Sequence, residues 1–177
     1  MKVSVFIAAS LDGFIARSDG GLDWLEAAPD PDEDYGYAEF MARVDVLVMG
    51  RVTFEKVTTF PEWPYAGKRV IVLSRLLREL PAVYQERAEL RRDLPADLVE
   101  HLRREGCTRV YVDGGLTIQA FLDAGLITDL TLTRIPVLLG SGIPLFGPLD
   151  RDVRLQHQAT RAYASGYVQS TYTLAPV

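Results

Sequence analysis

Guanidinium and hydroxyl side chains directly follow two apolar runs of this sequence. The segment 50–53 comes after the run 44–49, and the segment 74–75, a serine and an arginine, comes after the run 69–73. Short apolar runs that alternate with helical segments predict a largely parallel sheet, whose ligands gather at the carboxyl ends of the strands. A guanidinium group is a fork-shaped donor for phosphate. The spacing therefore indicates a site for a phosphorylated ligand, and the second segment suits a ribose 2′-phosphate.

A pair of glycines follows a third apolar run. The segment Asp113–Thr117 comes directly after the run 109–112 and contains Gly114 and Gly115. Paired glycines between a strand and a helix allow a pyrophosphate to lie against the helix N-terminus with no side chain in the way. Each of the three segments, taken singly, could be no more than a tight turn. Their equivalent positions favour a dinucleotide, although the longer G-x-G-x-x-G fingerprint is absent.

The elements that would position these residues alternate between strand and helix over most of the chain. About eight strands are expected, and the clearest are 3–9, 44–49, 68–74, 109–112, 129–135, 153–159 and 167–174. The last three have no helix between them, so the sheet should finish with antiparallel strands. We therefore predict an α/β fold in a single domain over residues 1–177, with a mixed, mostly parallel sheet and helices on both faces.

Helical periodicity and capping residues indicate four helices between the strands. They are expected at 34–43, at 51–57, between a cap at Asp93 and a stop at Gly106, and at 117–124. The longest connection, Gly20–Gly36, is rich in Pro, Asp and Gly, and long ordered loops often bind ligands. This loop is therefore a candidate lid.

Composition excludes several classes of function. The chain has 177 residues, 48% of them hydrophobic, a net charge of −5 and a pI near 5.1. An acidic protein is a poor partner for nucleic acid or an anionic membrane. The single cysteine, Cys107, suits a reducing compartment, and no run reaches the ~20 apolar residues that span a bilayer. We expect a soluble, cytoplasmic protein with no metal site, because His101 and His157 have no partner at ligand spacing.

The order of five short motifs resembles the dihydrofolate reductase superfamily. Within it, the sequence is closest to the C-terminal reductase domain of the bifunctional riboflavin-biosynthesis deaminase-reductases, which the segment 133–147 resembles strongly. The five motifs are residues 10–16, 22–24, 48–53, 72–75 and 112–115. The zinc-binding pattern of the deaminase half is absent from the sequence, so a stand-alone reductase with a dihydrofolate reductase-like fold is expected. By the same analogy the protein would be a homodimer.

The resemblance implies NADPH as the cofactor. It implies contacts from the three segments described above and from the last residues of two apolar runs, namely Ala9, Gly50, Arg51, Thr53, Leu73, Ser74, Arg75, Gly114, Gly115, Leu116 and Thr117. It also implies that Leu22–Trp24 belongs to a mobile loop that closes over the nicotinamide.

Two carboxylates are candidates for the proton donor that hydride reduction of a C=N or C=O bond requires. Dihydrofolate reductases have a carboxylate sixteen residues before the glycine of their Gly-Arg-x-Thr motif, and here that position is Asp34. Asp34 also lies in an acidic stretch, 30–34, that could simply cap a helix. Asp113 is the rival, because a carboxylate at the end of a central strand would be partly desolvated and have a raised pKa.

Three further residues are candidates for substrate contacts. The rings of Phe14 and Trp24 could stack on a flat heterocycle, although Phe14 could equally pack in the core. Arg134 is the remaining candidate for a substrate phosphate. The expected function is NADPH-dependent reduction of a planar heterocycle, either pterin-like or a ribosylaminopyrimidine such as 5-amino-6-(5-phosphoribosylamino)uracil. The alternative is a non-catalytic NADP(H)-binding sensor or assembly module.

Overall fold

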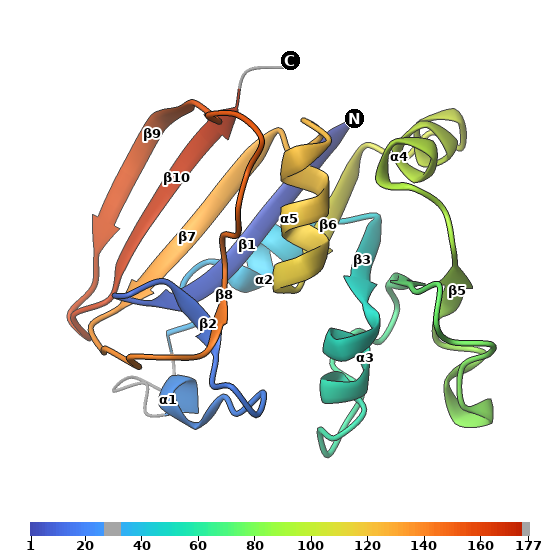
Figure 1. The fold of residues 1–177 in the computed structure, drawn as a ribbon, viewed down its shortest axis with the longest axis horizontal. Helices are drawn as coiled ribbons and strands as arrows, with labels where there is room; N and C mark the ends of the chain where they lie inside the picture. The colour runs from blue at the N-terminus through green and yellow to red at the C-terminus, as the bar shows by residue number, and fades with distance from the viewer. Residues whose placement is uncertain (27–32, 175–177) are drawn as a thin grey trace.

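An eight-stranded sheet forms the centre of the protein in a computed structural model, which describes residues 1–26 and 33–174 (Figure 1). Across the sheet the strands follow the order β5-β4-β3-β6-β1-β7-β10-β9. Their bounds are β1 Lys2–Ser10, β3 Val46–Gly50, β4 Arg69–Leu73, β5 Glu89–Arg91, β6 Arg109–Asp113, β7 Asp129–Ile135, β9 Leu155–Ala162 and β10 Val168–Leu174. A separate small sheet pairs β2, Phe14–Ala16, with β8, Ile143–Pro144.

The strand directions match the sequence prediction. Neighbouring strands from β5 to β7 run parallel, whereas β10 is antiparallel to both β7 and β9. The prediction of a mostly parallel sheet that finishes with antiparallel strands is therefore confirmed. As a consequence β3, β4 and β6 all end at one edge of the sheet, where the segments 50–53, 74–75 and 113–117 begin.

Helices cover both faces of the sheet, as predicted, and β3 shows why. Its Val46 and Val48 pack in one core with helices α4 and α5, while Leu47 and Met49 pack in a second core with α2 and α3. All four side chains are at most 1% exposed, so this strand is apolar on both faces. The helices are α1 Asp23–Glu26, α2 Tyr37–Ala42, α3 Arg51–Val57, α4 Pro95–Arg104 and α5 Gly115–Asp123, with a short 3-10 helix at Ala82–Tyr84.

The first of the five motifs forms a turn that joins β1 to a distant loop. The Ser10 hydroxyl donates to Asp12 Oδ1 at 2.6 Å and accepts the Phe14 N–H at 2.9 Å. Asp12 also accepts the N–H groups of Leu139, at 3.2 Å, and Gly140, at 2.7 Å. These bonds, the one from Ser10 first, lower the pKa of Asp12. The motif therefore fixes the loop that leads into β8 against the end of β1.

Three helix starts differ from the sequence prediction, and the smallest difference is at α5, which begins at Gly115, two residues before the expected start. The helix expected at 34–43 begins only at Tyr37, because Tyr35 and Gly36 have positive φ angles of 55° and 81°. Asp93 does not cap α4; it pairs with Arg91 at 2.8 Å instead. Strands β2, β5 and β8 were not among the clearest strands predicted from the sequence, because each has only two or three residues.

Two further features concern the described residues only. None of their helices is long and apolar enough to cross a membrane. Within residues 1–26 and 33–174, no three His, Cys, Asp or Glu side chains come together as a candidate metal site.

Candidate active site

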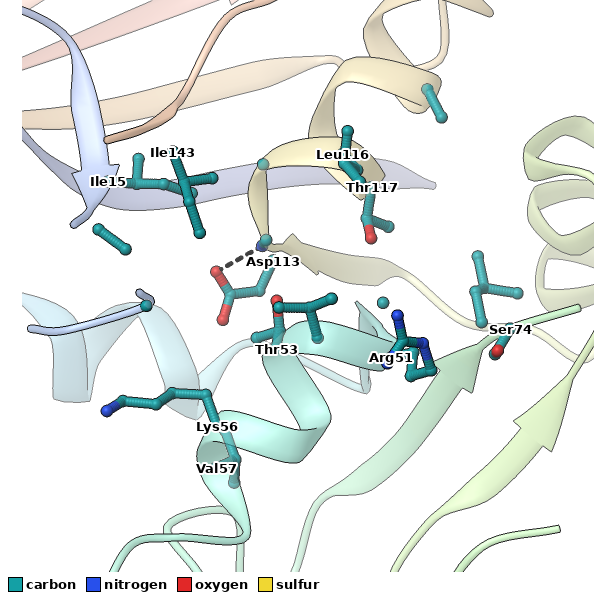
Figure 2. A pocket seen from close by; sticks show the side chains of 18 of the residues that line it. Ile15, Arg51, Thr53, Lys56, Val57, Ser74, Asp113, Leu116, Thr117 and Ile143 are labelled. Atoms are coloured by element: carbon teal, nitrogen blue, oxygen red, sulfur yellow. Dashed lines mark hydrogen bonds between the residues drawn. The ribbon is translucent and has the colours of Figure 1, made fainter. Parts of the chain in front are cut away.

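A cavity of about 1000 Å³ opens at the edge of the sheet where β3, β4 and β6 end. The three segments 50–53, 73–76 and 113–117 all line it. Figure 2 shows Arg51, Thr53 and Thr117 around this opening, with Ser74 further along the same edge. The small sheet of β2 and β8 and the helix α1 complete the other side of the cavity. Segments that are more than 60 residues apart in the sequence thus form one site.

The glycines of this site are required by the close approach of two helices. A Cβ atom on Gly114, whose φ is +91°, would overlap the hydroxyl oxygen of Thr53, and one on Gly50 would lie 2.6 Å from the hydroxyl oxygen of Thr117. The two threonines and two glycines therefore pack α3 and α5 against each other across the cavity. Only glycine allows this approach, and at Gly114 only glycine readily adopts the backbone angle.

The cations of the lining differ in how strongly they are engaged. Arg51 donates through Nη1 to both carboxylate oxygens of Glu55 at 2.8 Å. Arg92 donates to the backbone carbonyls of Leu77 and Arg78 at 2.7 and 3.0 Å. Arg75 is exposed and has no hydrogen bond or ion pair with the described residues. Its guanidinium group is therefore available to a bound anion.

Of the two aspartates that line the cavity, Asp93 pairs with Arg91, and Asp113 is the one without an ion pair among the described residues. It lies at the end of the central strand β6, and its Oδ1 accepts the N–H of Gly114 at 2.8 Å. Removal of the carboxylate from water raises its pKa to about 6, although the bond from Gly114 opposes this shift. In Figure 2 the carboxyl group points into the space between β6 and α3. A carboxyl group with this pKa can hold and release a proton near neutral pH.

Three tyrosines lie near the acid. Burial, and then the charge of Asp113, raise the pKa of Tyr37 to about 12 and those of Tyr65 and Tyr111 as well. All three hydroxyls therefore keep their protons at physiological pH. The Tyr111 hydroxyl donates to the carbonyl of Phe6 at 2.9 Å, whereas Tyr65 lines the cavity itself. These protonated groups give Asp113 neutral surroundings on this side, which is consistent with its raised pKa.

The structure brings together nearly all of the predicted cofactor residues. Gly50, Arg51, Thr53, Leu73, Ser74, Arg75, Gly114, Gly115, Leu116 and Thr117 line the cavity, as does Asp113. Ala9 does not line it, since it is buried in the core of β1 at 2% exposure, and its neighbours Ile7 and Ala8 line the cavity in its place. That the predicted residues of this lining bind a cofactor stays a prediction.

Asp34 lies outside the cavity lining. Its side chain is exposed and accepts the N–H groups of Gly36 and Ala38 at 2.9 and 2.8 Å. These backbone bonds, the one from Ala38 first, lower its pKa. Asp34 therefore acts as a cap at the start of α2, and of the two acids only Asp113 lines the cavity. Residues 27–32 of the acidic loop lie outside the described residues.

The three predicted substrate residues also lie outside the lining. Phe14 belongs to β2, whose next residues, Ile15 and Ala16, line the cavity instead. Trp24 is 6% exposed and packs with Ile135 and Tyr167. The nearby residues Leu22 and Leu25, one before α1 and one in it, do line the cavity.

Arg134 is the third of these residues, and it is exposed on β7. The residue that the sequence analysis missed is Lys56, which lines the cavity from α3. Its spacing of three from Thr53 places both on one helix face, and that spacing was the available signal.

Comparison with known proteins identifies a family and several proteins of the same fold. The model of the RibD C-terminal domain family matches residues 1–169. The uncharacterized protein YwjB of Bacillus subtilis (strain 168) is 33% identical over 177 residues, with 98% of each chain covered. A crystal structure described as a putative riboflavin biosynthesis protein, from Shewanella sp. PV-4, is 41% identical, with a TM-score of 0.94 and 99% of each chain covered.

A bifunctional protein shares the fold at lower identity. It is the diaminohydroxyphosphoribosylaminopyrimidine deaminase/5-amino-6-(5-phosphoribosylamino)uracil reductase of Thermotoga maritima, with a TM-score of 0.75 and 13% identity. The match covers 98% of this chain and 56% of the bifunctional protein. Together with the sheet order and the cavity at its edge, these matches show that the chain belongs to the RibD C-terminal domain family, with a dihydrofolate reductase-like fold.

Proposed function

We propose that this protein is an NADPH-dependent reductase that acts on a C=N or C=O bond of a flat, pyrimidine-like or pterin-like heterocycle. The observation that carries the proposal is that three segments suited to phosphate binding and a half-buried acid with a raised pKa line one cavity. Membership of a reductase-like family supports it, and so does the uracil reductase named among the proteins of the same fold. NADPH, when bound, would supply the hydride.

The residues at one end of the cavity fit a phosphorylated dinucleotide. Ser74 and Arg75 offer a hydroxyl and a free guanidinium group, and the first turn of α5 leaves backbone N–H groups without intrahelical partners. Leu76 and Leu116, which are 80% and 76% exposed, line the same cavity. Exposed apolar side chains beside an anion site give an adenine ring a surface to cover. The donor set therefore suits NADPH better than a simple phosphate.

Asp113 would supply the proton. Its raised pKa keeps part of the carboxyl population protonated near neutral pH, and it lines the cavity in which the substrate would bind. Asp34 is a helix cap with a lowered pKa, so the proposal gives this role to Asp113 alone. Thr53 and Thr117 would hold the two glycine turns in place around the ligand.

Binding of NADPH and NADH to the Arg75→Ala variant tests the cofactor assignment. We expect NADPH affinity to fall by about tenfold to a hundredfold, because a charge-assisted phosphate contact is lost. NADH lacks the 2′-phosphate, so its affinity should change little. Quenching of tryptophan fluorescence during titration would give both dissociation constants.

The matched control is Arg78→Ala, which removes an exposed arginine three residues away that does not line the cavity. Equal affinity of the unaltered protein for the two cofactors would contradict the role of Ser74 and Arg75. Tight NADPH binding without oxidation by any pyrimidine or pterin substrate would instead favour a non-catalytic NADP(H)-binding sensor or assembly module.

A further inference from the structure

We infer that Lys56 binds an anionic group attached directly to the ring of the substrate. The inference rests on the proposed function, because it concerns the part of the cavity that the cofactor would leave open. It narrows the substrate class to flat heterocycles that carry an acid on the ring, as opposed to those that carry it at the end of a ribosyl chain.

Lys56 occupies a distinct place in the cavity. It lies on α3, one turn after Thr53, and its half-buried side chain lines the cavity. Figure 2 shows its ammonium group extending away from Ser74 and Arg51, toward the side where Ile15 and Ile143 lie. The ammonium group makes no hydrogen bond or ion pair with Asp113 or with any other of the described residues, whereas the backbone carbonyl of Lys56 accepts the Thr59 hydroxyl at 2.7 Å. An ammonium group that lines a cavity and forms no ion pair with a carboxylate of the described residues favours an anionic ligand.

The other cations of the lining are already paired or lie at the other end of the cavity. Arg51 is bound by Glu55, and Arg92 is bound by the carbonyls of Leu77 and Arg78. Arg75 follows β4, next to Ser74, at the end that the proposed function gives to the cofactor. Arg134, the arginine that the sequence suggested for a substrate phosphate, is exposed on β7 and outside the lining. Lys56 is thus the cation that faces the substrate half.

Most of the side chains around this half are apolar. The described residues that β1, β2 and α1 contribute to the lining are Ile7, Ala8, Ile15, Ala16, Leu22 and Leu25, and Phe60 lies beyond the end of α3. None of these side chains can hydrogen-bond. A ribosyl chain would leave several hydroxyls unpaired against such walls, and each unpaired buried hydroxyl weakens binding. A flat ring with one acid suits a largely apolar slot in which Lys56 supplies the positive charge and Asp113 lies at the end of β6.

Matched pairs of small probes test the inference, with the cofactor half filled by saturating NADP⁺. The first pair is 6-carboxypterin and its neutral analogue 6-hydroxymethylpterin, and the second is uridine 5′-monophosphate and uridine. Ligand-observed NMR titrations would give the dissociation constants. We expect the carboxylate on the ring to improve affinity about tenfold, as one charge-assisted contact does in a partly solvated site. We expect a smaller gain from the phosphate on the ribose, because the ribose does not suit the walls.

The variant Lys56→Met should abolish the preference for 6-carboxypterin while NADP⁺ binding is unchanged. Lys2→Met is the matched control, since it removes the same charge from an exposed position at the start of β1. Equal binding of the two pterins to the unaltered protein, binding of neither pterin, or a preference that survives Lys56→Met would overturn the assignment. A larger gain from the ribosyl phosphate would overturn the choice of a ring acid. Failure of NADP⁺ to bind would instead refute the proposed function, and the same titrations without NADP⁺ would still test Lys56.

Discussion

Asp113 and Asp34 show how the surroundings of a residue decide its chemistry. Both are aspartates, yet burial raises the pKa of Asp113 to about 6, whereas backbone N–H donors lower the pKa of Asp34. The first carboxyl group lines the cavity, and the second lies at the surface before α2. The residue type alone therefore does not show which of the two aspartates has the raised pKa. What separates them is desolvation at Asp113 and the backbone N–H donors at Asp34.

Replacement of Asp113 by Asn should therefore change the pH dependence of stability. The pKa of this carboxyl group is raised in the folded state, so its ionisation opposes folding, and stability is lost as the pH rises from the unfolded pKa toward about 6. At a pH of about 8 the variant should be more stable by up to roughly 2–3 kcal/mol, which corresponds to a shift of about two pKa units. At a pH of about 3 the gain should vanish. Urea unfolding of both proteins at several pH values would measure this difference in unfolding free energy.

The same substitution tests the role of the carboxyl group in turnover. If Asp113 delivers the proton, the rate of the unaltered protein should fall as the pH rises through about 6, and the variant should lose that dependence together with most of its activity. Asp34→Asn is the matched control and should retain the profile. A variant with an unchanged pH–rate profile would remove Asp113 from the mechanism.

At the level of elements, the site depends on how closely α3 and α5 approach each other. Each helix starts at a glycine that faces a threonine of the other helix, Gly114 against Thr53 and Gly50 against Thr117. This reciprocal packing fixes the spacing of two of the three segments that line the cavity. A small change at a glycine therefore acts on cofactor binding without removing any group that contacts the ligand.

Gly114→Ala should destabilise the protein by more than about 1 kcal/mol, because the methyl group overlaps the Thr53 hydroxyl and the φ angle of +91° is unfavourable for alanine. Gly140→Ala is the control: its φ of +74° is also positive, but no atom lies within 4 Å of the added Cβ. Thermal unfolding of both variants would separate strain from overlap. Thr53→Ala, added to each variant, should recover part of the lost stability in the Gly114→Ala protein and none of it in the Gly140→Ala protein. A double variant with purely additive losses would contradict the contact.

Much of the fold could be predicted from the sequence because its central strands are buried on both faces. Runs such as 44–49 and 109–112 are continuously apolar, and their ends carry the glycines that the site uses. β2 and β8 could not be found in this way, since two or three residues give no periodicity and their pairing joins distant segments. Lys56 was missed for a related reason. Its side chain faces a cavity that exists only once β2 and α1 are in place.

At the scale of the whole molecule, the two ends of the sheet differ. β5, at one end, is short and tied by Glu89 to Arg69 of β4 at 2.6 Å. β9, at the other end, has eight residues, and all of them are exposed. An exposed edge strand can pair with a further strand, and natural proteins usually protect such edges. The region of β9 is therefore a candidate surface for self-association.

A homodimer stays a prediction, and sedimentation equilibrium tests it directly. We expect a mass of twice the 19.7 kDa of the chain. If β9 takes part, the outward backbone amides of Leu155–Ala162 should exchange their hydrogens more slowly at high protein concentration than at low concentration. A monomer at all concentrations would remove the dimer from the account, and a dimer with fast exchange throughout β9 would place its interface elsewhere.

The position of β1 in the middle of the sheet has a consequence for synthesis on the ribosome. Residues 2–10 pair on one side with β6 and on the other with β7, whose residues are made more than 100 positions later. The apolar strand β1 therefore lacks both of its neighbouring strands until residues 109–135 have been translated. Chaperones that hold nascent apolar segments would be most useful to this protein during that interval, and slow translation before residue 109 would prolong it.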